Sequence, residues 1–166
     1  MEEQKKHADP VAAIAEMAEQ SGTRIAVAES LTGGLISTRL AEAGGASRWY
    51  AGAIVAYTSE VKRAVLGVPD GPVVSERAAT AMAFGARRLL RADAALAITG
   101  VGGPDRQDDQ PPGTVWVGVV TSTRRDVRCW EILGDGPADI CRRAAERALR
   151  YLRDELVAEI DAAGGS

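Results

Sequence analysis

The sequence is poor in the residues on which common catalytic and metal sites depend. It has one histidine and two cysteines among 166 residues, and His7 lies in a charged N-terminal stretch. A histidine-based catalytic triad or metal site would need this stretch to fold inward, so we predict neither. Cys129 and Cys141 fit neither a disulfide framework nor a CxxC motif. We therefore expect both cysteines to be reduced, and we expect no metal and no other cofactor.

Long apolar runs and an excess of positive charge are also missing. The net charge is −3, which argues against a general binder of nucleic acid or of anionic membranes. No apolar run approaches the roughly 18 residues that cross a bilayer, and the N-terminus lacks a signal-peptide pattern. Hydrophobic residues make up 46% of the chain, enough for one folded domain. We expect a soluble, cytoplasmic protein with a single domain at 10–160 and flexible tails at 1–9 and 161–166.

Lysine is scarce, and its distribution is informative. Three of the 20 basic residues are lysines: Lys5 and Lys6 lie in the N-terminal tail, and Lys62 lies in the body of the chain. A desolvated lysine can lose its proton near neutral pH, whereas arginine cannot. Lys62 is therefore a candidate base, with an ordinary surface lysine as the alternative.

Hydrophobic periodicity and turn residues predict alternating strands and helices. Helices are predicted at 10–20, at 35–43, after the N-cap residues 58–60, at 75–91 and at 138–160. Strands are predicted at 24–28, 49–57 and 94–99, with a hairpin of 114–121 and 127–133. Residues 105–112 are polar and contain prolines, which predicts a mobile connection. This order predicts an α/β fold, a three-layer α/β/α sandwich with a mainly parallel, mixed sheet, whose ligands bind where strands end.

The turn after the first predicted strand combines hydroxyl groups with glycines. Ser30, Thr32, Gly33 and Gly34 stand where a helix begins, and unpaired backbone N–H groups at such a position favour an anion. A phosphate or an oxyanion fits this chemistry. A capped helix without a ligand is the alternative.

The turn after the third predicted strand is also rich in glycine. Thr99, Gly100 and Gly102 allow the backbone to approach a small ligand closely, or the glycines only turn the chain. Pro104 follows where a dinucleotide-binding loop would start its helix, so the pattern does not indicate a Rossmann site. On the last predicted helix, arginines form a basic face that is either solvated or able to hold a phosphate; Arg142 is our candidate.

Without an available histidine, a nucleophilic serine needs another base. Ser30 and Lys62 form such a pair if both side chains face the same strand ends, because Ser–Lys pairs are a known variant of the triad. Burial and the neighbouring cation Arg63 would lower the pKa of Lys62. Tyr57 can hydrogen-bond either partner, or it is a strand-end aromatic with its hydroxyl in water. Backbone N–H groups near Gly33, Gly100 or Gly102 are candidates for holding an oxyanion.

Five motifs in order carry a resemblance to a known family: AESLTGG (28–34), GAIVAYTSEVK (52–62), VVSE (73–76), ITGVGGP (98–104) and PPGTVWVGV (111–119). Together the motifs resemble the C-terminal domain of the competence-damage protein CinA, the nicotinamide mononucleotide deamidase family, in its stand-alone form. The resemblance covers about residues 10–156. It departs from the family at Leu31, where cysteine is common, and in the arginine region around 140–143.

The resemblance implies an amidohydrolase that converts nicotinamide mononucleotide (NMN) to nicotinic acid mononucleotide and ammonia, without a metal, in pyridine-nucleotide salvage. The family's serine, tyrosine and lysine fall on Ser30, Tyr57 and Lys62. We also expect a homo-oligomer, because exposed tryptophans and a partner's arginine suit such a contact. Two alternatives remain: a nucleotide-binding regulatory module without turnover, and an amidase for another small carboxamide.

Overall fold

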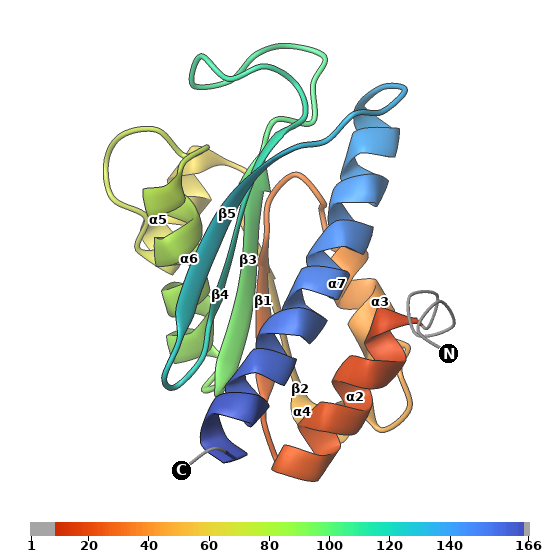
Figure 1. Ribbon diagram of the computed structural model, residues 1–166. Helices are drawn as coiled ribbons and strands as arrows, with labels where there is room; N and C mark the ends of the chain where they lie inside the picture. Colours follow the sequence, from red (N-terminus) through yellow and green to blue (C-terminus); the bar gives the residue numbers. More distant parts are fainter. Residues whose placement is uncertain (1–8, 165–166) are drawn as a thin grey trace.

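The computed structural model describes residues 9–164 and has three layers (Figure 1). It is a three-layer α/β/α sandwich built on one five-stranded mixed sheet, as the sequence predicts. The elements follow along the chain as α2 (Pro10–Ser21), β1 (Ile25–Glu29), α3 (Leu35–Ala41), α4 (Ala46–Trp49), β2 (Tyr50–Val55), α5 (Ser59–Leu66), α6 (Glu76–Leu89), β3 (Ala94–Gly100), β4 (Thr114–Val120), β5 (Arg125–Glu131) and α7 (Pro137–Gly164).

The sheet has the strand order β2-β1-β3-β4-β5. Strands β1, β2 and β3 are parallel, whereas β4 and β5 are antiparallel additions. Strands β1 and β3 are buried at every position, because helices cover both faces of the sheet, and this explains their unbroken apolar sequences. Glu29 pairs with Val55 and with Ile98, so the three parallel strands end at one edge. The segments that follow them therefore meet there.

Each face of the sheet has its own hydrophobic core. Helices α5 and α6 cover one face, where Met82 and Leu66 are almost fully buried. Helices α2, α3, α4 and α7 cover the other face, where Ile14, Trp49 and Leu149 are buried (Figure 1). Full burial of each large apolar side chain stabilises the fold by about 1.5–3 kcal/mol. These two cores fix the sheet edge relative to the helices on both sides.

The predicted helix caps are confirmed. The Thr58 side chain accepts a hydrogen bond from the N–H of Val61 at 3.3 Å, at the start of α5. The Ser75 side chain accepts one from the N–H of Ala78 at 3.1 Å, at the start of α6. Both caps satisfy backbone donors that the first helical turn leaves unpaired. The Thr58 cap starts α5 directly after β2, and this places Lys62 one turn into the helix.

Several element boundaries differ from those predicted. Trp49 ends a short helix, α4, rather than starting β2, and its buried indole anchors that helix in the core. The second hairpin strand starts at Arg125, two residues earlier than predicted. Helix α7 continues to Gly164, because residues 161–164 include two alanines, which favour helix. Asp9 caps α2 by accepting from the N–H of Val11. The predictions for residues 1–8, which include Lys5, Lys6 and His7, and for residues 165–166 lie outside the described residues.

The connection between β3 and β4, for which a mobile loop is predicted at 105–112, contains a hydrogen-bonded turn. Gln107 and Gln110 exchange two backbone hydrogen bonds, of 3.1 and 2.8 Å, around a tight turn. Asp108 and Asp109 at the tip have positive φ angles of 51° and 61°, which aspartate tolerates better than most residues. The Asp108 carboxylate binds the backbone of residues 73–74. Local pairing and this distant contact outweigh the polar composition. No helix among residues 9–164 is both long and apolar enough to span a bilayer.

Candidate active site

A cleft of about 380 Å³ lies at the edge where β1 and β3 end. Four segments contribute to it: the turns after β1, β2 and β3, and the start of α7. It is lined by Ser30, Leu31, Tyr57, Gly100, Val101, Gly102, Gly103, Pro104, Asp105, Arg106, Gln107, Pro137 and Cys141. Of the predicted site residues, the structure brings Ser30, Tyr57, Gly100 and Gly102 to this cleft. It does not place Thr32, Gly33, Gly34, Thr99, Lys62 or Arg142 among the lining residues.

Ser30 is held rigidly at the base of the cleft. It directly follows β1, and its N–H donates to the carbonyl of Ile98 on β3 at 3.1 Å. Only 3% of the residue is exposed, so its surroundings are largely dry. The N–H groups of Leu31 and Gly102, two neighbours in the cleft wall, donate to no acceptor within residues 9–164. A buried hydroxyl beside free N–H donors suits attack on a carbonyl group.

The start of α3 does not offer the anion site that its glycines suggest. The carboxylate of Glu29 is fully buried and accepts hydrogen bonds from the N–H groups of Gly34, Ile36 and Ser37 at 3.3, 3.0 and 2.9 Å. The N–H of Gly33 donates to the carbonyl of Ser30. A carboxylate from the chain itself therefore occupies the helix N-terminus.

Thr32 lies in the same turn and keeps its hydroxyl inside the protein. Its Oγ1 is buried and has no hydrogen-bond partner within the described part of the chain. Gly33 and Gly34 have positive φ angles of 58° and 110°, which glycine adopts without strain. The two glycines thus shape the turn that presents Ser30.

Lys62 is buried, with 2% of the residue exposed. Its Nζ donates to the carbonyl oxygen of Tyr57 at 3.3 Å, and no carboxylate among the described residues forms an ion pair with it. Burial lowers the pKa of the amine from its ordinary value, while the negative charge of Asp108 opposes this shift. No direct hydrogen bond joins Lys62 to Ser30 in residues 9–164. The amine is therefore bonded to the backbone of a residue that lines the cleft, and its pKa is lowered, as expected of a base.

Tyr57 contributes to this arrangement through its backbone. Its carbonyl holds the Lys62 amine, whereas 70% of the residue is exposed and its ring lies at the rim of the cleft. The hydroxyl makes no hydrogen bond among the residues that the structure describes. The predicted orientation of the Ser30 and Lys62 pair by a tyrosine hydroxyl is thus absent from this geometry.

The turn after β3 divides into structural and lining residues. Thr99 is fully buried, and its hydroxyl donates to the carbonyl of Val73 at 2.7 Å. A Cβ at Gly100 would lie 2.6 Å from the carbonyl oxygen of Thr114, so this glycine is needed where β3 approaches β4. A Cβ at Gly102 would meet Cys141 Sγ at 3.4 Å. The N–H groups of Gly102 and of its neighbour Gly103 donate to no acceptor within residues 9–164, and both glycines line the cleft.

Sequence reasoning missed several residues of the cleft. Asp105, Arg106 and Gln107 come from the connection that was predicted to be mobile, and the pairing of 107 with 110 gave no recognisable signal. Cys141 enters the wall from α7; its thiol donates to the carbonyl of Leu31 at 3.0 Å, and burial raises its pKa. A single cysteine on a helix carries no sequence signal for such a role. Arg106 is the cation that lines the cleft in the described chain.

Arg142 lies elsewhere. It is bonded to Asp139 within α7, and its side chain lines a separate surface hollow with Arg143, Glu146 and Arg150. Asp139 also pairs with Arg143 at 2.7 Å, so intrahelical ion pairs account for much of the predicted basic face. The structure thus separates this face from the cleft.

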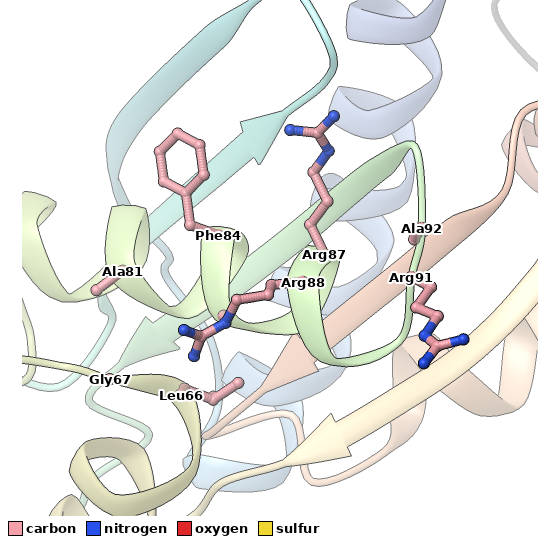
Figure 2. A pocket seen from close by; sticks show the side chains of 9 residues that line it. Leu66, Gly67, Ala81, Phe84, Arg87, Arg88, Arg91 and Ala92 are labelled. Atoms are coloured by element: carbon pink, nitrogen blue, oxygen red, sulfur yellow. The ribbon is translucent and has the colours of Figure 1, made fainter.

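A larger hollow, of about 530 Å³, lies between the end of α5 and the second half of α6. Figure 2 shows that its three arginines, Arg87, Arg88 and Arg91, point in different directions, with Phe84 to one side. The arginines therefore do not converge on one position where an anion could bind. Within residues 9–164 no three potential metal-ligating side chains cluster together.

Comparison with known proteins assigns the chain to a family. The sequence model of the CinA C-terminal domain matches residues 7–156. A putative competence-damage inducible protein of Desulforamulus reducens is 44% identical over 115 residues, which is 66% of this chain and 28% of that protein. A CinA-like protein of Geobacter sulfurreducens is 38% identical over 151 residues, 87% of this chain and 36% of that protein. The chain thus spans about a third of the length of these curated relatives.

Solved structures agree with this assignment. A CinA superfamily protein of Klebsiella pneumoniae is similar with a TM-score of 0.84 and 29% identity, covering 90% of this chain and 96% of that one. A competence/damage inducible protein of Agrobacterium tumefaciens gives a TM-score of 0.79 and 30% identity, with 87% and 94% covered. Sequence, fold and the order of the motifs around the cleft therefore agree: the chain belongs to the CinA C-terminal domain family.

Proposed function

We propose that the protein hydrolyses the carboxamide of NMN, yielding nicotinic acid mononucleotide and ammonia, with Ser30 as nucleophile and Lys62 as base. The observation that carries this proposal is the burial of the Lys62 amine, unpaired with any carboxylate in residues 9–164, beside the cleft that holds Ser30. An amine in this position has a lowered pKa, which raises the fraction of the neutral form that can accept a proton.

The first step forms an ester between Ser30 and the substrate. The serine oxygen attacks the amide carbon, and its proton passes to Lys62, which later gives a proton to the departing ammonia. The amine must turn from the carbonyl of Tyr57 toward Ser30 for this transfer. Catalytic hydrogen bonds are often absent or long before the substrate binds.

The negative charge that develops on the amide oxygen needs donors in the cleft. The N–H groups of Leu31 and Gly102 have no acceptor within residues 9–164 and belong to residues that line the same cleft as Ser30, which supports their role as an oxyanion hole. Loss of one such donor typically slows a reaction about 10²- to 10³-fold. Water then attacks the ester, and Lys62 accepts its proton, which releases the carboxylate product and restores the serine.

The phosphate of NMN needs a cation at the other end of the cleft. Arg106 lines the cleft on the β3–β4 connection, whereas Arg142 lies outside it and is paired with Asp139. Arginine binds phosphate oxygens in a bidentate manner. We therefore assign phosphate binding to Arg106, and this replaces Arg142.

The test is ammonia release from NMN by purified protein. We expect Ser30→Ala to lower turnover at least about 10³-fold, because it removes the nucleophile. Ser47→Ala is the matched control: Ser47 is an exposed serine on α4, so it should keep wild-type turnover. Full activity in Ser30→Ala, or no release of ammonia by the wild type, would disprove the proposal.

A nucleotide-binding module without turnover is the second candidate. The specific observation in its favour is that Lys62 bonds to the carbonyl of Tyr57 rather than to Ser30. Calorimetry with NMN separates the two candidates, since a binding module would show heat of binding and no ammonia. Faster hydrolysis of nicotinamide or nicotinamide riboside than of NMN would reveal an amidase for another small carboxamide.

A further inference from the structure

One acidic residue links the outer wall of the cleft to the segment in front of α6. The carboxylate of Asp108, at the tip of the β3–β4 connection, accepts hydrogen bonds from the N–H groups of Val73 and Val74 at 2.7 and 2.9 Å. The same Oδ2 atom receives both bonds. The carbonyl of Val73 is held in turn by the hydroxyl of Thr99 at 2.7 Å. Asp108 therefore fastens the connection to a segment that is itself anchored to β3.

The connection that Asp108 fastens carries part of the cleft wall. Asp105, Arg106 and Gln107 precede it directly and line the cleft, and Arg106 also donates to the carbonyl of Asp109 within the turn. Without Asp108 the turn would keep only local contacts among the described residues, chiefly the pairing of Gln107 with Gln110 and the bond from Arg106 to Asp109. The position of Arg106 thus depends on the Asp108 contact.

The negative charge of Asp108 also acts on the amine of Lys62, where it opposes the effect of burial on the pKa. The nearby cation Arg63 approaches Asp70 at 3.7 Å and bonds to the carbonyl of Gly71. The other charged groups on these elements are Glu60 on α5, Glu76, Arg77, Arg87 and Arg88 on α6, and Asp105, Arg106 and Asp109 on the connection.

We propose that Asp108 is a positioning residue that fastens the β3–β4 connection to residues 73–74 in front of α6, and that its negative charge acts on Lys62. The proposal deepens the proposed function, on which its catalytic part rests. Because one carboxylate both holds the connection and acts on the amine, the position of Arg106 is coupled to the charge state of Lys62. A change that releases the turn also removes the charge that favours the protonated amine.

Two substitutions separate the tasks, and the neighbouring aspartate provides matched controls. Asp108→Gly removes the carboxylate, while glycine still tolerates the positive φ of 51°. Asp108→Asn keeps one acceptor oxygen but removes the charge. Asp109→Gly and Asp109→Asn make the same changes one residue further on, at a φ of 61°, where the carboxylate makes no hydrogen bond within residues 9–164.

The first measurement is hydrogen exchange at the amides of Val73 and Val74. We expect faster exchange in Asp108→Gly, an intermediate rate in Asp108→Asn, and wild-type rates in both Asp109 variants. Equal exchange in the Asp108 and Asp109 variants would overturn the fastening role.

The second measurement is the titration of the Lys62 amine by NMR on protein labelled with ¹⁵N-lysine, with Lys62→Arg assigning the signal. We expect its midpoint to move to lower pH in both Asp108 variants and to stay in both Asp109 variants. In NMN assays the acidic limb of the kcat/KM profile should move in the same direction. Unchanged midpoints would overturn the electrostatic role. If the wild type does not hydrolyse NMN, the proposed function fails, yet exchange and titration still decide what Asp108 does.

Discussion

The hollow between α5 and α6 and the cleft at the ends of the parallel strands differ in the groups that line them. The hollow on α6 is larger and contains three arginines and a half-exposed phenylalanine, Phe84. The cleft at the strand ends is smaller, about 380 Å³ against 530 Å³, and one arginine lines it. Only the cleft combines a buried hydroxyl, free backbone donors and a nearby buried amine. Its polar groups come from several segments, whereas the hollow is formed mainly by α6.

Convergence of groups from several segments, rather than size or charge, therefore distinguishes a candidate active site. Arginines spaced along one helix diverge, as Figure 2 shows for Arg87, Arg88 and Arg91. Residues that follow parallel strands must meet, because Glu29 pairs with both Val55 and Ile98 at one edge of the sheet. Burial at this edge also lowers the pKa of Lys62, whereas solvent weakens such shifts for side chains in an open hollow.

The largest expected contrast between the hollows is in turnover. Lys62→Arg keeps a positive charge but cannot supply a neutral amine, so we expect kcat for NMN to fall about 10²- to 10⁴-fold, the usual contribution of a general base. Arg88→Ala and Phe84→Ala in the other hollow should leave kcat within about twofold. Ammonia release measures all three variants. A fall in kcat in the Phe84 or Arg88 variant, together with wild-type kcat in Lys62→Arg, would place the active site in the hollow rather than in the cleft.

The next contrast concerns the carboxylate that holds the turn before α3. Glu29→Gln removes the negative charge and replaces one acceptor oxygen by an amide group, so at least one of the three N–H donors loses its acceptor. We expect the free energy of unfolding to fall by about 3 kcal/mol, since each bond from a buried donor to a charged acceptor contributes about 1.5–3 kcal/mol. Urea denaturation measures the change. Glu42→Gln, an exposed residue at the end of α3, is the control, and a loss below 1 kcal/mol at Glu29 would contradict the role of its carboxylate.

A smaller contrast lies in substrate affinity. Arg106→Ala should raise KM for NMN about ten- to hundredfold, the range for a lost hydrogen bond to a charged group, with little change in kcat. It should not affect hydrolysis of nicotinamide riboside, which lacks the phosphate. Steady-state kinetics on both substrates makes the test. A larger KM effect from Arg142→Ala than from Arg106→Ala would return phosphate binding to α7.

Most of the fold follows from local patterns in the sequence. Unbroken apolar runs predicted β1 and β3, and the Thr58 and Ser75 caps predicted the starts of α5 and α6. Each pattern reflects burial, or the pairing of backbone N–H groups, within a few residues. Helix α4 was not predicted, since its four residues are held by packing of Trp49 rather than by propensity.

The candidate site was only partly predictable. The scarcity of lysine pointed to Lys62, and the strand-end rule pointed to Ser30. The role of Glu29 at the N-terminus of α3 was invisible, because its partners are backbone N–H groups with no residue-specific signal. Asp108 and Arg106 were missed for a related reason. The contact between the β3–β4 turn and residues 73–74 joins residues that are about 35 positions apart in the sequence. Long-range contacts to backbone leave no periodic trace.

The smallest contrast is in stability, and it follows the charge of Lys62. Below the lowered pKa of the folded state, both folded and unfolded chains bind the proton, and the fold bears the full cost of a buried cation. Between this pKa and the unfolded value of about 10.4, the folded chain has released the proton that the unfolded chain still binds, so wild-type stability rises with pH. Above both values the cost is gone.

Lys62→Met removes the amine and keeps much of the apolar volume, so it should be more stable than wild type at pH 7 while losing turnover. Its advantage should shrink as the pH rises toward 10, because only the wild type gains stability over that interval. Thermal melting at several pH values measures this. Arg63→Met, an exposed neighbour with one ion pair of 3.7 Å to Asp70, should show no such trend. A stability difference between Lys62→Met and wild type that stays constant with pH would mean that the charged amine does not destabilise the fold. Lys62 would then resemble the solvated arginines of the α6 hollow.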